Sequence, residues 1–186
     1  LAKFNALGSR ITGLQYNGSW TATNKLINII KREQPNVVHL HCINGYFVNI
    51  YKLLEFLKKK NIKTVLTLHA EFMYTANCGI AFECEKWITG CGNCPQLFNA
   101  TKSICFDRTN VSWNMLKKTF ENYENLTVVS VSDWLHKRAK QSPFFKEEKC
   151  VIIENGIDTK HTFYPVPYND LKQKYNYNPV PYQITP

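Results

Sequence analysis

Four of the seven cysteines fall in one short stretch of this 186-residue chain. Their spacing is Cys-x5-Cys-x6-Cys-x2-Cys, at Cys78, Cys84, Cys91 and Cys94. The Gly-containing bend between the last two allows both thiolates to bind one metal ion, and the first two complete a tetrahedron. We interpret the cluster as a structural zinc site. Two disulfides, a redox Cys-x-x-Cys pair and four reduced thiols remain as alternatives.

The remaining cysteines and several histidines and serines stand apart from this cluster. Cys42, Cys105 and Cys150 are expected to be buried apolar residues. Other polar side chains lie at or near the carboxyl ends of the predicted strands, namely His39, His41, His69, Ser130, Ser132, Asn155 and Asp158. Imidazole groups donate, accept and carry charge near neutral pH, and therefore suit catalysis.

Apolar periodicity predicts the elements that position these groups. Helices are expected over residues 23–34, 49–59, 110–122 and 133–140. Strands are expected over residues 36–41, 63–69, 126–131 and 149–153, the first of them buried on both faces. Residues 1–19 are expected to be irregular. Strands that alternate with helices predict a parallel, Rossmann-like sheet, whose ligands bind beyond the carboxyl ends of the strands.

Two segments lack a sustained period. Residues 70–103 are too long for an ordinary connection, which indicates a Cys-rich loop insertion. The segment from Tyr164 onward contains five prolines and is expected to be a linker.

The chain is basic, with 23 Lys and Arg against 14 Asp and Glu and a formal charge of +9. This balance favours phosphate-rich partners, although a solvated basic face explains it equally well. The run Lys58-Lys59-Lys60 ends a predicted helix, where cations complement the helix dipole. One alternative function is therefore a zinc-stapled basic module that binds nucleic acid. No apolar run approaches the roughly 18 to 20 residues that span a bilayer.

An ordered set of motifs narrows the function. The strings are His39-Leu40-His41-Cys42-Ile43-Asn44-Gly45-Tyr46, Thr67-Leu68-His69, Cys84-Glu85-Lys86-Trp87, Cys91-Gly92-Asn93-Cys94-Pro95-Gln96, Ser130-Val131-Ser132 and Asn155-Gly156-Ile157-Asp158. Over residues 23–165, this set resembles the family-four glycosyltransferases of the GT-B fold. The resemblance is strongest to the bacterial branch that builds colanic-acid-like and capsular polysaccharides.

The resemblance implies the N-terminal, acceptor-side half of a two-domain GT-B enzyme. Residues 1–163 would form the Rossmann-like acceptor domain, with its first strand preceding Leu1. Residues 164–186 would form the linker and the start of the nucleotide-sugar-binding domain. The implied reaction is transfer of a sugar, with retention, from a nucleotide-sugar to a glycan or lipid-linked acceptor. The fragment alone is expected to be inactive.

The resemblance also assigns site residues. His69 would contact the reacting sugar as the catalytic residue. His41, Asn44, Gly45 and Tyr46 would shape the acceptor side, and Ser132 and Asn155 would hydrogen-bond a ligand. Family members carry His-Asp where this chain has His69-Ala70, and Glu71 is the candidate substitute for that carboxylate. The departure leaves a second alternative, a non-catalytic sugar-binding lobe.

The resemblance further implies a cytoplasmic protein, peripheral to the inner face of the membrane. Trp113, Lys117 and Lys118 share one predicted helix and are candidates for contact with anionic lipid; the favoured alternative is a helix simply packed on the sheet. No nucleic acid partner is expected.

Overall fold

The computed structural model describes residues 2–76, 78–145, 149–162 and 174. Four parallel strands form one sheet in the order β1-β2-β3-β4, with β1 at Val37–His41, β2 at Lys63–Leu68, β3 at Leu126–Ser130 and β4 at Lys149–Ile152. The helices are α1 Ala2–Thr12, α2 Trp20–Glu33, α3 Ile50–Lys59, α4 Lys86–Thr89, α5 Thr109–Phe120 and α6 Asp133–Ala139, with a 3-10 turn η1 at Glu71–Met73. The predicted α/β fold, a Rossmann-like parallel sheet flanked by helices, is confirmed.

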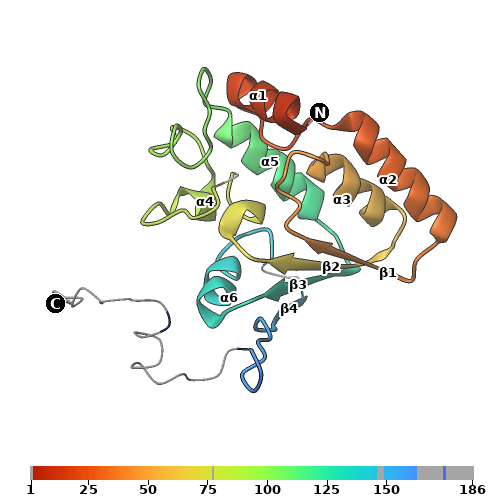
Figure 1. The fold of residues 1–186 in the computed structure, drawn as a ribbon. Coiled ribbons are helices and arrows are strands. Elements are labelled where there is room, and N and C mark those ends of the chain that lie inside the picture. Colours follow the sequence, from red (N-terminus) through yellow and green to blue (C-terminus); the bar gives the residue numbers. More distant parts are fainter. Residues whose placement is uncertain (1, 77, 146–148, 163–173, 175–186) are drawn as a thin grey trace. The chain divides into compact units, whose positions relative to one another are not determined.

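Helices α2, α3 and α5 lie over one face of the sheet (Figure 1). The apolar face of α3 supplies Leu53, Leu54 and Leu57, all of which are buried, and Leu66 and Val128 face the same core from the sheet. The long segment between β2 and α5 lies beyond the carboxyl ends of the strands and contains only the short elements η1 and α4 (Figure 1). The predicted loop insertion is therefore present.

Local signals set the helix boundaries. Asn49 caps α3, because its side-chain oxygen accepts a hydrogen bond from the Lys52 N–H at 3.0 Å. Helix α2 ends one residue before Gln34-Pro35, where the proline disfavours further helical geometry. It begins at Trp20, three residues before the predicted start.

The prediction of an irregular N-terminal segment is wrong, because α1 occupies residues 2–12. Phe4, Leu7 and Ile11 share one face of this helix, a spacing that would have predicted it. Gly8 in its interior weakens the helical signal. The helix ends at Gly13, whose φ of 73° suits glycine and whose N–H donates to the Ser9 carbonyl at 2.9 Å.

The prediction that the first strand is buried on both faces is also wrong. Within β1, Leu40 is the one buried residue, and Val37 is 49% exposed. Among the described strands, β1 pairs with β2 alone, so it forms an edge of the sheet. The burial of a strand depends on its neighbours on both sides, which its own apolar composition does not specify.

The chain divides into two units, Leu1–Glu154 and Asn155–Pro186. The predicted linker at residues 164–186 lies outside the described residues except for Lys174. Every helix of the described residues is too short or too polar to cross a bilayer.

Candidate functional site

Three histidines meet at the carboxyl ends of β1 and β2. The Nδ1 atom of His41 lies 3.1 Å from Nε2 of His69, and the His39 and His41 ring centroids are 4.1 Å apart. The strand register pairs His41 with Thr67, two residues before His69. Histidines 28 residues apart in the sequence are thus brought together at the edge of the sheet where ligands of such folds bind.

The contact between His41 and His69 gives the two facing nitrogens different roles. A hydrogen bond between two imidazole nitrogens requires one N–H donor and one unprotonated acceptor. Both rings are exposed, so the ring nitrogens outside this bond remain accessible to a ligand. Burial lowers the pKa of His39, and the neighbouring His41 lowers it further. The His39 ring nitrogen Nε2 lies 2.8 Å from the Thr67 hydroxyl.

Glu71 does not replace the carboxylate that the family carries after the histidine, so this prediction is wrong. Its side chain is fully buried and points into the protein, where Oε1 contacts the Arg138 Nε at 2.5 Å and accepts from the Tyr74 hydroxyl at 2.9 Å. The second oxygen, Oε2, accepts from the Ala81 N–H. These contacts join the start of the Cys-rich loop to α6.

Arg138 is the structural residue that the sequence analysis did not single out. Its guanidinium lies over two indole rings, 5.1 Å from the centroid of Trp87 and 5.3 Å from that of Trp134. The ion pair raises the pKa of Arg138 against the opposing effect of its burial, which is the largest contribution. An acidic residue in the otherwise apolar string Glu71-Phe72-Met73 was the one available signal, because such a carboxylate needs a cation when it is buried.

The loop after β1 continues directly from His41 to α3. Asn44 is half-buried, Gly45 is exposed, and a Cβ atom on Gly45 would lie 2.6 Å from the Phe47 ring. Tyr46 is held by the protein itself, since its hydroxyl donates to Gln15 Oε1 at 2.6 Å and its ring packs on Tyr16. Asn44 and Gly45 are closer to His41 in the sequence than Tyr46 is.

Two serines lie at the end of β3. The Ser132 hydroxyl caps α6 by accepting from the Leu135 N–H at 3.2 Å, which leaves its own O–H free to donate. The Ser130 hydroxyl is buried and has no hydrogen-bond partner among the residues that the structure describes. Ser130 pairs in register with Leu68, the residue before His69.

Asn155 is the first residue of the second unit, Asn155–Pro186. There, Asp158 Oδ1 accepts from the N–H groups of Lys160 and His161, both at 3.0 Å. Both hydrogen bonds lower the pKa of the Asp158 carboxyl, and the bond from the His161 N–H has the larger effect. The Asn-Gly-Ile-Asp string therefore leads into a turn that its own carboxylate stabilises.

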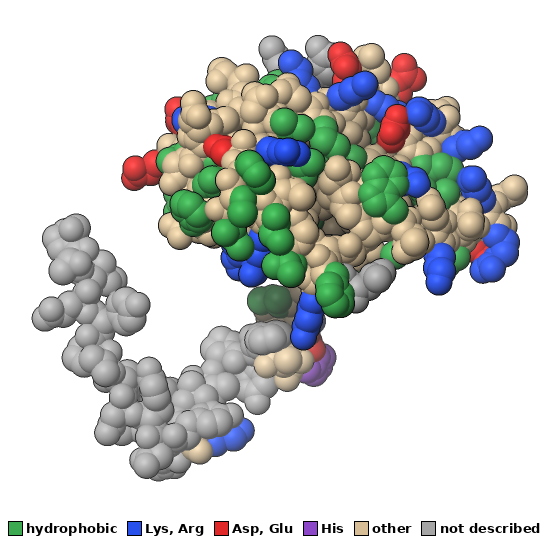
Figure 2. Space-filling model, turned by 90° about the horizontal axis from the view of Figure 1, so that it is seen from above, with side chains coloured by type: hydrophobic (Ala, Val, Ile, Leu, Met, Phe, Trp, Pro, Cys, Tyr) green, Lys and Arg blue, Asp and Glu red, His purple; other side chains and the backbone are tan. Residues whose placement is uncertain are grey.

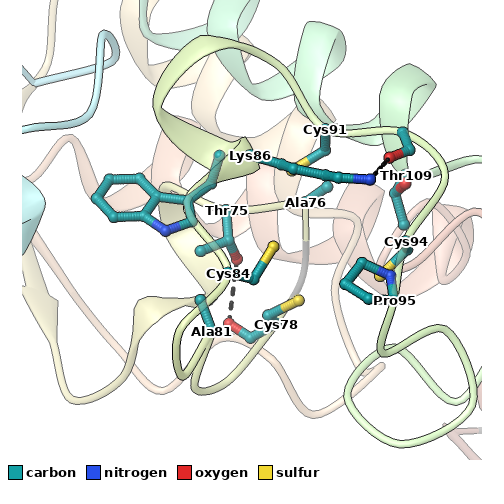
Figure 3. Close-up of a pocket in the computed structure, with 12 residues that line it drawn as sticks. Thr75, Ala76, Cys78, Ala81, Cys84, Lys86, Cys91, Cys94, Pro95 and Thr109 are labelled. Atoms are coloured by element: carbon teal, nitrogen blue, oxygen red, sulfur yellow. Dashed lines mark hydrogen bonds between the residues drawn. The ribbon is translucent and has the colours of Figure 1, made fainter.

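The four clustered cysteines line one cavity. Cys78, Cys84, Cys91 and Cys94 surround it together with Lys86 and Trp87, among others (Figure 3). The Cys78 and Cys94 thiols are hydrogen-bonded, which raises the pKa of Cys78 and lowers the pKa of Cys94 to about 7. All seven cysteines are free thiols. As arranged here, the described His, Cys, Asp and Glu side chains include no group of three or more that could hold a metal ion.

The expectation that the other three cysteines are buried is wrong for Cys42 and Cys105, which are exposed. Cys150 is half-buried and packs against the core, so the expectation is met in part there. Both exposed residues lie in loops, where neighbouring apolar composition is a poor guide to burial.

The predicted lipid contact on α5 is wrong in its apolar part. Trp113 is only 5% exposed, and its indole N–H donates to the Trp87 carbonyl at 2.9 Å. The Lys117 ammonium lies over this ring, 5.4 Å from its centroid. Trp113 thus belongs to the core beneath the Cys-rich loop.

Many basic side chains have structural partners. The Lys58 ammonium donates to the Lys118 and Glu121 carbonyls at the end of α5, at 3.0 and 2.9 Å. Lys59 pairs with Glu55 and Lys137 with Asp133. Figure 2 shows Lys and Arg side chains interspersed with apolar, acidic and other side chains over one face. This arrangement gives little support to the nucleic-acid-binding alternative.

Comparisons with known proteins agree with the motifs. The model of Glycosyltransferase Family 4 matches residues 9–161. The sequence is 31% identical over 141 residues to the putative colanic acid biosynthesis glycosyl transferase WcaC of Escherichia coli (strain K12). That match covers 73% of this chain but 35% of WcaC, so the chain spans about a third of its relative's length. No solved structure gives a significant match. Because the family model covers most of the chain, the chain belongs to glycosyltransferase family 4.

Proposed function

We propose that this chain forms the acceptor side of a retaining glycosyltransferase in polysaccharide biosynthesis. The enzyme would move a sugar from a nucleotide-sugar to a glycan or lipid-linked acceptor. Family membership supports the reaction class, and the name of the WcaC relative supports the pathway. The observation that carries the proposal is the contact between His41 and His69 at the carboxyl ends of two parallel strands.

In the proposed reaction, the bond between the anomeric carbon and the diphosphate oxygen breaks, and a bond to the acceptor oxygen forms. The diphosphate leaves with the electrons of the broken bond, and its oxygen takes up the proton that the acceptor hydroxyl loses. Such chemistry depends mainly on positioning and on stabilising charge. His69 is the proposed catalytic residue, because its exposed ring can hydrogen-bond a hydroxyl of the reacting sugar. His41 is then a positioning residue that fixes the orientation of the His69 ring.

The other site residues belong to the same proposal. Asn44 and Gly45 would border the acceptor, and Tyr46 would hold their loop in place through Gln15. Ser132 would donate a hydrogen bond to a ligand. Asn155 is also proposed to hydrogen-bond a ligand. We place the boundary of the acceptor domain near residue 163, with the nucleotide-sugar bound by a second domain. The proposed place of action is the cytoplasm, at the inner face of the membrane.

The test is replacement of each histidine by glutamine in the natural full-length protein. We expect His69→Gln to lower kcat by about 10²- to 10³-fold, which is the usual cost of removing one hydrogen-bond donor that stabilises the transition state. His41→Gln should cost less, since it acts through His69. His136→Gln, a histidine on α6 outside this contact, is the matched control and should leave turnover unchanged.

The measurement is release of nucleotide diphosphate from a panel of nucleotide-sugars in the presence of glycan and lipid-linked acceptors. NMR of the product should show the anomeric configuration of the donor. Normal turnover of His69→Gln would reject His69 as the catalytic residue, and an inverted product would reject the retaining mechanism.

A non-catalytic sugar-binding lobe is the second candidate, and Ala70 favours it. The position after His69 has no carboxylate, and Glu71 is committed to Arg138. Sugar binding by the full-length protein without turnover of any donor would support this candidate.

A further inference from the structure

The Cys-rich loop brings together four thiols that the proposed glycosyl transfer does not use. Cys78 follows η1, Cys84 precedes α4, and Cys91 and Cys94 follow α4. Figure 3 shows the four side chains around one small space, together with Lys86. The cavity measures about 20 Å³, which suffices for one small ion or one water molecule. Segments up to 16 positions apart in the sequence therefore contribute cysteines to the lining of a single cavity.

The bend between Cys91 and Cys94 is fixed from several sides. Gly92 and Asn93 have positive φ values of 145° and 46°. The Cys94 N–H donates to Asp107 Oδ2 at 2.6 Å, and the Asn110 side chain donates to the Cys91 carbonyl at 3.0 Å. The backbone of this Cys-x-x-Cys turn is therefore held in place before any ligand binds.

The charge around the bend between Cys91 and Cys94 also suits a metal ion that is bound by thiolates. The Lys86 ammonium donates to the Gly92 carbonyl at 3.2 Å and to the Asn93 carbonyl at 2.7 Å. A divalent ion with four thiolates carries a net charge of −2, and a cation at the edge of the cavity offsets part of it. Lys86 lines the cavity and occupies this position.

The Cys-rich loop buries apolar side chains such as Phe72, Tyr74 and Trp87, but several others are exposed. Phe82 and Phe98 are 67% and 70% exposed, and Ile80 is 51% exposed. Glu71 and Trp87 anchor the loop at two points. A bound metal ion would cross-link the parts of the loop that carry the four cysteines.

We propose that Cys78, Cys84, Cys91 and Cys94 bind one structural zinc ion in a closed tetrahedral site. Four thiolates and one short Cys-x-x-Cys spacing are typical of structural zinc, and soft sulfur ligands select it over harder divalent ions. The thiols as described here do not yet form a complete metal-binding group, so their side chains must rotate inward around the ion. Each sulfur that binds releases its proton to solvent. The proposal is independent of catalysis, because the ligands stand apart from His41 and His69.

The experiment measures zinc in the protein purified under reducing conditions without added metal or chelator. Inductively coupled plasma mass spectrometry should give one zinc ion per chain. Cys84→Ser and Cys94→Ser should each reduce the zinc content at least tenfold. Cys105→Ser, which replaces an exposed cysteine outside the cluster, is the matched control and should retain a full complement.

A second measurement covers the case in which the serine variants fail to fold. Cobalt(II) exchanged into the wild-type protein should give the strong visible bands and the sulfur-to-metal charge-transfer band of tetrahedral thiolate coordination. Wild-type protein without zinc, or a cobalt spectrum of octahedral oxygen coordination, would overturn the proposal. Iodoacetamide mapping that finds the four cysteines paired in disulfides would overturn it as well.

Discussion

The Glu71 carboxylate and the Arg138 guanidinium form an ion pair that links the residues just after His69 to helix α6. The two residues are 67 positions apart in the sequence, and the Glu71 side chain is fully buried. Because β2 ends at Leu68, this pair anchors the chain two residues after the proposed catalytic histidine. It is therefore one contact through which the body of the domain can help to position His69.

Glu71→Gln should destabilise the protein by about 3 kcal/mol, since removing one partner leaves the other charge buried and uncompensated. The measurement is urea denaturation monitored by tryptophan fluorescence. Glu55→Gln is the matched control. Its pair with Lys59 is more than half exposed on both sides, and it should cost less than about 1 kcal/mol. Equal effects of the two substitutions would show that the Glu71–Arg138 pair is not a structural anchor.

Alanine substitutions at two glycines, one inside α1 and one directly after it, should have opposite effects on the stability of the protein. Gly8 lies inside α1 with no atom within 4 Å of a Cβ position, so Gly8→Ala should stabilise the protein by about 0.5 to 1 kcal/mol. Gly13 has a φ of 73°, and a Cβ atom there would lie 2.2 Å from the Phe106 carbonyl oxygen. Gly13→Ala should therefore destabilise it by at least about 2 kcal/mol.

The same urea titrations measure both glycine variants. Each variant serves as the control for the other, since the chemical change is identical. A stabilising effect of Gly13→Ala would mean that α1 does not end at this residue.

The sequence predicted those features that depend on short-range periodicity. The spacing of Leu53, Leu54 and Leu57 marks the buried face of α3, and proline after Gln34 marks the end of α2. Alternation of such helices with apolar strands was sufficient for the parallel sheet, and parallel strands were sufficient to bring His41 to His69. Convergence of the four cysteines on one cavity also followed from their spacing.

Features that depend on long-range partners could not be predicted in this way. Glu71 was assigned to the site because it follows His69 closely, but Arg138 and Tyr74 draw its side chain into the interior. Trp113 was placed on a surface because its helix carries lysines, but the Cys-rich loop covers it through the Trp87 carbonyl. In both cases, the decisive partner comes from another element, and nothing in the local pattern specifies it.

His39 should titrate below the usual histidine value of about 6.5. Burial is the main cause of its lowered pKa, and the neighbouring His41 is the second. His41→Gln should therefore raise the pKa of His39 without restoring the usual value, because burial persists. Two-dimensional NMR of the imidazole nitrogens against pH measures both proteins. A wild-type His39 with a pKa of 6.5 or above would contradict the structure.

The His39 imidazole also contributes to the pH dependence of the free energy of unfolding. The folded protein binds a proton at His39 less readily than the unfolded chain does, so the unfolded chain takes up this proton first as the pH falls below about 6.5. The free energy of unfolding should therefore decrease as the pH falls from this value through the lowered pKa of the folded state. His39→Gln should remove this part of the decrease, and denaturation curves at several pH values would show it.

Ala70→Asp tests whether the missing carboxylate limits activity. Ala70 has an extended backbone, with φ of −161°, and packs at the edge of the core. A carboxylate at this position can stabilise positive charge on His69 as charge develops during transfer. A hydrogen bond to a charged group contributes about 1.5 to 3 kcal/mol, so kcat of the full-length enzyme should rise about tenfold or more.

Ala70→Asn is the matched control, since it adds the same bulk to the half-buried position without the charge. We expect it to leave kcat at or below the wild-type value. If Ala70→Asp and Ala70→Asn behave alike, charge next to His69 does not limit the reaction, and the pair of His41 and His69 suffices for it. If the wild-type protein has no turnover and Ala70→Asp acquires it, the natural chain is a sugar-binding lobe that lost catalysis at this one position.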